Sequence, residues 1–481
     1  MAILLFLGFS SGLPLFLTSK TLQLWMQDAK IELGTITLFS LVGVPYSLKF
    51  LWSPLLDRFV PPFLGRRRSW LILTQIGLVF AIAAMALQQP SQNLQSLQIL
   101  AIIALIITFL SATQDIAGDA YRTDILSPLE AGAGASVWVL GYRMALLATG
   151  FLALVLADYI SWNAVYLFMA AFMGVGIIAT LFAPSEPVLE GEQHSAPISA
   201  KDGIILLLFA LFLAGLIGGL ITGFISLPTL SLLIAGLLAV WIVAAFILPK
   251  KRLNNVAESR PPQSLQDAVV LPFQEFFGRF GVMQASLILA FILLYKLGDS
   301  LVGITANLFL QEINFSKTEI GAIQGGMGFF ATTVGVLAGG AILTKIGMNR
   351  ALWIFGILQL VSNLGYYALA VFGKNYSLLV LAINIENLCA GLITVVTVAY
   401  LMSLCNHSFT TTQFALFSSL VAISRDIISA PAGKIAVMTG WSTFFLLSIV
   451  AALPGLLLLP FIAPWNSPPI AMAKPGLNDD Y

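Results

Sequence analysis

The chain has 481 residues, of which 59% are hydrophobic and only 9% are charged. Soluble globular proteins have about 25% charged residues, so this composition excludes an ordinary soluble domain and indicates a protein that crosses a membrane many times. The net charge of +1, with no basic tract among aromatics, gives no reason to expect a nucleic-acid partner. Apolar runs of about twenty residues favour helices over the alternating strands of a barrel.

Fourteen apolar segments predict an all-α polytopic membrane protein. They are Ala2–Met26, Thr35–Leu56, Ser69–Gln88, Leu97–Ala117, Gly132–Asp158, Asn163–Pro184, Gly203–Ile225, Thr229–Pro249, Gly281–Glu312, Ile320–Thr344, Ala351–Phe372, Ser377–Leu404, Thr411–Val437 and Trp441–Ile462. The first segment lacks a basic region and a cleavage site of small residues, so we interpret it as a span and not as a removed signal peptide.

The Lys and Arg residues of the loops predict the orientation. With the N-terminus in the cytoplasm, fourteen of them lie inside and four outside. Because positive charge collects on the cytoplasmic side of membrane proteins, we predict that both termini are cytoplasmic.

The segments divide into two groups of six around a pair without charge. The predicted parts are the N-terminal half 1–184, a cytoplasmic linker 185–202, an inserted helix pair 203–249, a second linker 250–278, the C-terminal half 279–463 and a cytoplasmic tail 464–481. An internal repeat supports this division, because a shift of 287 residues aligns Arg58 with Lys345 and a shift of 282 aligns Arg143 with Arg425. Parallel six-helix repeats are typical of transporters.

The loop after the second segment carries Asp57-Arg58 and then Gly65-Arg66-Arg67-Arg68. This pattern resembles the signature loop of the major facilitator superfamily, in which Asp-Arg and Gly-Arg-Arg are one residue apart. Here six residues separate Arg58 from Gly65, and Ser53 replaces the first Gly of the signature. The copy in the second half has Thr344 where the acid belongs.

Longer stretches resemble the AmpG family of muropeptide permeases. They are GLPLFLTSKTLQLWM (12–26), YSLKFLWSPLLDRFVPPFLGRRRSWL (46–71), QDIAGDAYRTDIL (114–126), VLGYRMALLATG (139–150) and YKLGDS (295–300). The resemblance implies a major facilitator fold with fourteen transmembrane helices, in the bacterial inner membrane. It also implies a working monomer without cofactors that imports N-acetylglucosaminyl-1,6-anhydro-N-acetylmuramyl peptides with protons. Acetyl-CoA transporters share some of these motifs, so another large anionic metabolite is the alternative cargo.

A proton-coupled importer needs a carboxylate that binds and releases a proton. In the run SATQDIAGDAYRTDIL, the spacing of Asp115, Asp119 and Arg122 places all three on one face of a helix. Asp115 is the first candidate, and Lys49 lies at a similar depth, so we predict a Lys49–Asp115 contact. A permanent structural ion pair is the alternative.

Charges nearer the cytoplasm predict a gate. Asp119 and Arg122 are expected to lie beside the loop residues Asp57, Arg58, Arg66, Arg67 and Arg68, and to hold the inner side shut while the cavity faces outward. Solvated charges at a helix end are the alternative interpretation.

The second half contains two further candidate proton-binding acids. Asp299 and Lys296 flank Gly298 in a segment longer than the bilayer requires, so a bend or break near Gly298 is expected. Lys296 is a candidate for cargo binding, although it could pair with Asp299 instead. Glu386 is the lone acid of its segment and could equally be a permanently neutral acid bonded to neighbouring amides.

Cargo binding is predicted at residues in or near the middle of spans. Arg143 and Arg425 would suit the carboxylates of an anionic cargo. Trp138 and Tyr142 could stack on a sugar ring, and Gln114 could donate hydrogen bonds, although helix packing explains most such side chains.

The residues of an enzyme are not apparent. Both histidines, His194 and His407, fall in predicted loops, and no Cys or His spacing indicates a metal site. Two cysteines sixteen residues apart in one span cannot form a disulfide. The internal repeat and the charges in the spans favour a transporter over a structural or channel protein.

Overall fold

The computed structural model describes residues 1–31, 36, 39–61, 63–91, 93–127, 129–187, 215, 218–219, 236, 265–425 and 431–466. The regular structure of these residues is helical, without a strand among them. Ten of their helices or continuous helical runs are long and apolar enough to cross a membrane. The predicted inserted pair at 203–249 lies almost wholly outside the described residues.

Two predicted spans consist of shorter helices where the structure describes them. The first comprises η1 (Phe39–Gly43), α4 (Val44–Leu48), η2 (Lys49–Leu51) and α5 (Ser53–Arg58). The second comprises α20 (Thr410–Ile423) and α21 (Ala432–Thr439). Prolines lie in the first turns of α4 and α5, where a missing backbone N–H costs least, which explains why new helices begin there.

The chain divides into two compact units. Unit 1 comprises Met1–Ile125, Leu140–Glu275 and Cys405–Ser419, and unit 2 comprises Leu126–Val139, Phe276–Leu404 and Leu420–Tyr481. Each unit thus takes a short segment from the other predicted half. The beginning of α20 belongs to unit 1, and the beginning of α8 (Ala131–Leu147) belongs to unit 2.

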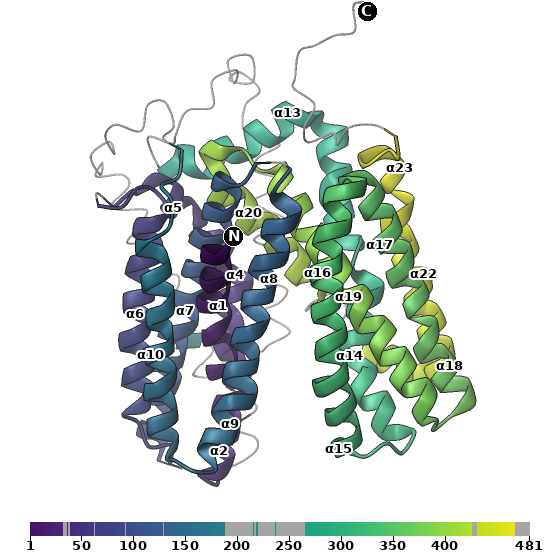
Figure 1. Cartoon of the computed structure of the whole chain (residues 1–481), viewed down its shortest axis with the longest axis horizontal. Helices are drawn as coiled ribbons and strands as arrows, with labels where there is room; N and C mark the ends of the chain where they lie inside the picture. The colour runs from purple at the N-terminus through teal and green to yellow at the C-terminus, as the bar shows by residue number, and fades with distance from the viewer. Residues whose placement is uncertain are drawn as a thin grey trace, which may run out of the picture. The chain divides into compact units, whose positions relative to one another are not determined.

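Unit 1 is built on four helices that contact one another side by side (Figure 1): α1 (Ala2–Leu17), α6 (Arg68–Ala86), α7 (Leu94–Ile125) and α10 (Trp162–Leu181). The chain also forms α2 (Lys20–Asp28) and continues α8 through the π-helical η3 (Ala148–Leu152) into α9 (Ala153–Ala157). Leu13, Leu78, Ile107 and Met173 are fully buried in the core of this unit.

Helices α1 and α8 approach each other closely because two glycines lie at the contact. A Cβ atom on Gly141 would lie 2.0 Å from the carbonyl oxygen of Leu5, and one on Gly12 would lie 2.6 Å from that of Tyr142. Small residues allow such backbone contact between membrane helices.

The long helices of unit 2 are α13 (Leu265–Leu294), α14 (Leu297–Glu312), α16 (Phe329–Ile346), α17 (Met348–Ser362), α19 (Tyr376–Leu404) and α22 (Trp441–Leu457). The shorter α18 (Leu364–Phe372) follows α17, and α23 (Leu459–Ile462) follows α22. The short α15 (Lys317–Ile320) and the π-helical η5 (Gly321–Gly328) lead into α16. The first residues of α13, through Glu275, belong to unit 1.

The predicted break near Gly298 is confirmed, since α13 ends at Leu294 and α14 begins at Leu297. The hydroxyl of Tyr295, at the break, donates a 2.6 Å hydrogen bond to the carbonyl oxygen of Leu352. A Cβ atom on Gly298 would lie 2.5 Å from the carbonyl oxygen of Ser448, so this glycine also allows close contact between α14 and α22. Gly281, with φ of 72°, separates the first part of α13 from the predicted span.

The two units repeat the same helix ending. Lys30 and Asn314 are the non-glycine residues with positive φ among the described residues, at 58° and 69°, and they lie 284 positions apart. The N–H groups of Ile31 and Phe315, one residue further on, each donate a 3.0 Å bond back to a carbonyl five residues earlier. This pattern is the Schellman helix cap, and it occurs here at equivalent places.

Aromatic packing follows the same repeat. The rings of Trp25 and Tyr166 lie 4.8 Å apart in unit 1, and those of Phe309 and Phe445 lie 4.8 Å apart in unit 2. The first pair joins α2 to α10, and the second joins α14 to α22. The repeat that the sequence suggested is therefore visible in the packing of the two units.

Candidate functional site

A stripe of polar side chains occupies the last turns of α7. Asp115, Asp119 and Arg122 are spaced by four and three residues along this helix. The Nη2 atom of Arg122 lies 2.9 Å from Oδ1 of Asp119. A charge in an apolar span is costly without a partner, so the contacts of each residue indicate its role.

Asp115 lies among hydroxyl groups from other helices. The hydroxyl of Ser11, in α1, donates a hydrogen bond to its carboxylate. Tyr46, in α4, donates a 2.9 Å bond to Ser111, which lies one turn before Asp115 on α7. We call Ser11, Tyr46, Ser111 and Asp115 the Asp115 cluster. It places a partly accessible carboxyl group next to uncharged hydroxyls, an arrangement that can bind and release a proton.

The salt bridge of Lys49 is with Asp119 and not with Asp115, although the charge of Lys49 still acts on Asp115. The Nζ atom of Lys49 lies 3.7 Å from Oδ2 of Asp119, one helical turn further along α7. The predicted depth of Lys49 in the membrane assumes one continuous helix, but Lys49 lies at the start of the short 3-10 helix η2. Asp119 consequently has two cationic partners, Lys49 and Arg122.

Gln114 lies within the helix packing of unit 1. Its side chain is 1% exposed and donates a 2.9 Å hydrogen bond to the hydroxyl of Ser10. Ser10 also packs closely against α10, since a Cβ atom on Gly176 would lie 2.1 Å from the hydroxyl oxygen of Ser10. Gln114 therefore joins α7 to α1, and its contact with a cargo stays a prediction.

A second group of charges surrounds the loop before α6, and we call Asp57, Arg66, Arg67, Asp124 and Thr412 the loop cluster. Oδ1 of Asp57 lies 3.0 Å from Nη2 of Arg66 and 2.9 Å from Nη1 of Arg67. The side chain of Asp57 is fully buried, as is that of Arg67. Buried charges of this kind persist only when they are paired and hydrogen-bonded.

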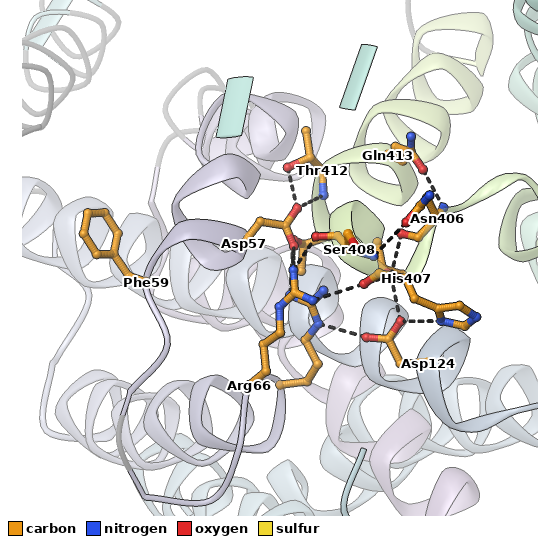
Figure 2. Close-up of polar contacts among 12 residues, drawn as sticks. Asp57, Phe59, Arg66, Asp124, Asn406, His407, Ser408, Thr412 and Gln413 are labelled. Atoms are coloured by element: carbon orange, nitrogen blue, oxygen red, sulfur yellow. Dashed lines mark hydrogen bonds and ion pairs between the residues drawn. The ribbon is translucent and has the colours of Figure 1, made fainter. Parts of the chain in front are cut away.

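The other oxygen of Asp57 binds the beginning of α20. Oδ2 accepts a 2.9 Å bond from the backbone N–H of Thr412 and a 2.6 Å bond from its hydroxyl. Figure 2 shows Asp57, Arg66 and Thr412 converging at this point. The first N–H groups of a helix lack partners within the helix and carry partial positive charge, so a carboxylate is favoured there.

Asp124 is the second carboxylate of the loop cluster. Its Oδ2 lies 3.1 Å from Nε of Arg67, and its Oδ1 accepts a 2.7 Å bond from the hydroxyl of Thr410. The ring nitrogen Nδ1 of His407 lies 3.2 Å from the same Oδ1 (Figure 2). This hydrogen bond is the main reason that the pKa of His407 is raised above its ordinary value.

Arg67 stays charged in its buried position. Burial alone would lower the pKa of its guanidinium, but the charges of Asp57 and Asp124 raise it above the ordinary value. The backbone N–H of Arg67 donates a 2.5 Å bond to Glu186, which follows α10. A Cβ atom on Gly65 would lie 3.0 Å from the same carboxylate oxygen, and Gly65 has φ of 101°, a conformation that favours glycine.

The three consecutive arginines have different partners. Besides Asp57, Arg66 donates to the carbonyl oxygens of His407 at 3.1 Å and Ser408 at 2.5 Å. Arg68, by contrast, donates to carbonyls at the end of α10, those of Thr180 and Leu181, at 3.3 and 3.0 Å. Unpaired carbonyls at a helix C-terminus attract cations, so these contacts of Arg68 are those of a helix cap and not of the loop cluster.

Two other predicted gate residues lie near the loop cluster. Arg58 is buried, with its guanidinium 5.3 Å from the centre of the Phe59 ring. Arg122 lies 5.4 Å from the centre of the Phe414 ring, so it contacts α20 as well as Asp119. The prediction that Arg122 lies close to this region therefore agrees with its contact on α20.

The beginning of α20 is also bonded to α13. Gln413 donates to Glu275 at 2.8 Å and to the carbonyl oxygen of Pro272 at 2.9 Å, and Asn406 donates to Glu275 at 3.1 Å. The segment around Thr412 is thus held from two sides, by the loop cluster and by the first part of α13.

Arg143 differs from the other cations of unit 1. It is partly exposed, and within the described part of the chain neither a carboxylate nor a hydrogen-bond acceptor contacts it. Tyr142 lies beside it at the close contact with Gly12, and Trp138 is 5% exposed. Arg425 is exposed and lies two residues after the end of α20. The cargo contacts of these residues stay predictions.

Two acids of unit 2, Asp299 and Glu386, accept hydrogen bonds from side-chain amides. Nε2 of Gln359 donates a 2.8 Å bond to Oδ1 of Asp299, and Nδ2 of Asn387 donates a 3.0 Å bond to Oε2 of Glu386. Lys296 is the residue immediately before α14, and its charge interacts with both acids. The described residues contain no group of His, Cys, Asp or Glu side chains arranged to hold a metal ion.

Sequence reasoning missed several of these residues. Asp124 contacts His407 across 283 positions, and Thr412 contacts Asp57 across 355 positions. The only available signals were the start of a predicted span at Thr411 and the acid two residues after Arg122. Glu186 and Gln359 carried no comparable signal.

Comparisons with known proteins agree with this architecture. Residues 1–168 match the family described as acetyl-coenzyme A transporter 1, and residues 203–425 match the major facilitator superfamily. The fold is similar to that of the proton:xylose symporter XylE, with a TM-score of 0.62 and 8% identity over 98% of this chain and 96% of that chain. The transporter FucP gives a TM-score of 0.61 with 13% identity over 96% of this chain and 97% of that one. The protein is a transporter of the major facilitator superfamily.

Sequence relatives define the family more narrowly. The anhydromuropeptide permease of Escherichia coli (strain K12) is 42% identical over 460 residues, which cover 95% of this chain and 78% of that protein. An uncharacterized protein of Haemophilus influenzae is 35% identical, covering 96% of this chain and 94% of the relative. The chain belongs to the AmpG family of permeases, as the sequence motifs predicted.

Proposed function

We propose that this protein imports anhydro-muropeptides from the periplasm into the cytoplasm together with protons, by alternating access. In this proposal it is a monomer in the bacterial inner membrane, with both termini in the cytoplasm. The observation that carries the proposal is the 42% identity to an anhydromuropeptide permease over 95% of the chain.

Proton coupling is assigned first to the Asp115 cluster. Asp115 lies in a membrane span, is partly accessible and accepts a hydrogen bond from the neutral hydroxyl of Ser11. A proton can therefore neutralise this carboxyl group without breaking an ion pair. Asp119 is less suited to the task because it forms ion pairs with Lys49 and Arg122, which a proton on its carboxylate would disrupt.

The loop cluster is proposed as the cytoplasmic gate. Asp57 holds the beginning of α20, a segment from the second half of the sequence, within unit 1. Opening towards the cytoplasm would require these bonds to break. Because they connect buried charges, their release would need compensation from bound cargo or protons.

Arg143 is proposed to bind an anionic group of the cargo. A guanidinium in a membrane span without a protein partner is costly, and a carboxylate on a bound ligand would compensate it. Trp138 and Tyr142, close by on α8, would offer aromatic faces to the sugar.

A second cargo has its own supporting observation. The family described as acetyl-coenzyme A transporter 1 matches residues 1–168. The alternative function is therefore the transport of acetyl-CoA, which is also a large anionic metabolite.

Uptake by purified protein in liposomes would test the proposal. We expect labelled anhydro-muropeptide to accumulate faster with an inward proton gradient, and Asp115→Asn to remove that acceleration while cargo still binds. Asp158→Asn, at an exposed aspartate, is the matched control. Gradient-independent uptake by the wild type would contradict proton coupling, and accumulation of acetyl-CoA alone would favour the second cargo.

A further inference from the structure

The buried side-chain amide of Gln359, in unit 2, forms a hydrogen bond with its nitrogen but not with its oxygen. Gln359 of α17 is 4% exposed, and its Nε2 atom donates a 2.8 Å hydrogen bond to Oδ1 of Asp299 on α14. The oxygen of the same amide, Oε1, is buried and has no hydrogen-bond partner in the described part of the chain. Buried acceptors are almost always satisfied in folded proteins, so this oxygen needs an explanation.

Protonation of Asp299 supplies one. An ionised carboxylate only accepts hydrogen bonds, so it can bond to the N–H side of an amide but not to its oxygen. A protonated carboxyl group has a hydroxyl that donates. Facing an amide, it can accept from the N–H group with one oxygen and donate to the carbonyl oxygen with the other.

We propose that Asp299 is a proton-binding carboxyl group of unit 2 and that Gln359 is its positioning residue, whose Oε1 accepts the hydroxyl of the protonated acid. The ionised acid then has one hydrogen bond to Gln359 and the protonated acid has two. This proposal rests on the proposed proton coupling and adds a second site to the Asp115 cluster.

The surroundings of Asp299 fit this role. Asp299 is partly accessible and lies in the first turn of α14, directly after the break between α13 and α14. The unpaired N–H groups at this helix start favour the ionised form of the acid. Charges and hydrogen bonds can thus stabilise either state of the acid. Among the described residues, the titratable groups that interact electrostatically with Asp299 are Lys296, Tyr366, Glu386 and Cys389.

The repeat offers a matched control in the same protein. Gln75 of α6 lies 284 positions before Gln359 and is also fully buried. Its Oε1 accepts a 2.8 Å bond from the hydroxyl of Thr180, and its Nε2 is buried without a hydrogen-bond partner, so no acid contacts its side chain among the described residues. Equivalent substitutions at Gln75 therefore change a buried amide without changing the surroundings of an acid.

Infrared spectroscopy of the reconstituted protein tests the proton directly. We expect a carbonyl band of a protonated carboxyl group that disappears in Asp299→Asn. In Gln359→Leu this band should move to higher frequency, because the carbonyl of Asp299 loses its hydrogen bond, whereas Gln75→Leu should leave it in place. Absence of the band at every pH tested, or a band whose frequency is the same in Gln359→Leu as in the wild type, would overturn the proposal.

The pH dependence of uptake gives a second readout with a nearly isosteric variant. Gln359→Glu places a second carboxyl group against Asp299, and two acids in one site favour a shared proton. The pH of half-maximal uptake should therefore rise by one unit or more, and Gln75→Glu should not shift it. Size-exclusion elution and circular dichroism check folding.

The two proposals fail separately. If uptake by the wild type does not depend on the proton gradient but the infrared band of Asp299 behaves as expected, the proposed proton coupling is wrong and the proposed proton site at Asp299 is still supported. If uptake follows the gradient and Gln359→Glu leaves its pH dependence unchanged, the role of Gln359 is wrong.

Discussion

The two units share a packing frame but hold their acids differently. Helix caps at Lys30 and Asn314 and aromatic pairs at Tyr166 and Phe445 occur at equivalent places. In unit 1, however, the buried Asp57 is neutralised by arginines, whereas in unit 2 Asp299 and Glu386 accept hydrogen bonds from amides. The comparison shows that a repeated helix frame leaves the polar chemistry of each half free to differ.

The largest expected effect comes from Asp57→Asn. The substitution leaves Arg66 and Arg67 without the charge that pairs with both, and breaking a buried ion pair on one side costs about 3–5 kcal/mol. We expect a strong loss of thermal stability in detergent and a weaker hold on the beginning of α20, which hydrogen exchange at Thr412 would report.

The counterpart in unit 2 sharpens this contrast. Glu386→Gln exchanges the carboxyl group for an amide of the same size that can still accept a bond from Asn387, so a change of about 1 kcal/mol or less is expected. Equal losses for the two variants would contradict the distinction between the units.

Glycines of the shared frame should give the next largest effect. A Cβ atom on Gly176 would lie 2.1 Å from the hydroxyl of Ser10, and one on Gly455 would lie 2.7 Å from Cα of Tyr295. We expect Gly176→Ala and Gly455→Ala each to cost about 1–3 kcal/mol in thermal unfolding, because the neighbouring helix must shift.

Gly174 is the matched control, since it lies on the same helix as Gly176 and nothing surrounds its missing Cβ within 4 Å. Gly174→Ala should be neutral or slightly stabilising. A large loss at Gly176 with none at Gly455 would show that the two units do not share this contact.

The smallest expected effect is the pH dependence of His407. Its bond to Asp124 raises its pKa, so the protonated histidine contributes fully below the ordinary pKa of about 6.5. The contribution disappears as the pH rises through the raised pKa. Because the side chain is 60% exposed, solvent weakens the pair and the effect should be modest.

Thermal unfolding between pH 5.5 and 8 would measure this contribution as a small fall in stability, about 1 kcal/mol or less. His407→Gln should remove this part of the pH dependence and keep the rest. A variant with the same pH profile as the wild type would show that the Asp124 contact adds nothing to stability.

The sequence alone determined the class of protein, most of the spans and the family. Long apolar segments have few alternatives to membrane helices, because unpaired backbone groups are too costly in lipid. The break near Gly298 was also predictable, since the segment exceeded the bilayer. The helical stripe of Asp115, Asp119 and Arg122 followed from its spacing.

Only the tertiary structure decided which charges meet. Lys49 pairs with Asp119 and not with Asp115 because short helices replace one continuous span. The side chain of Arg68 has different partners from those of Arg66 and Arg67, because it donates to backbone carbonyls at the end of α10. Asp57 reaches Thr412 across 355 positions, and the pairing of buried polar groups depends on such distant contacts, which local sequence patterns do not encode.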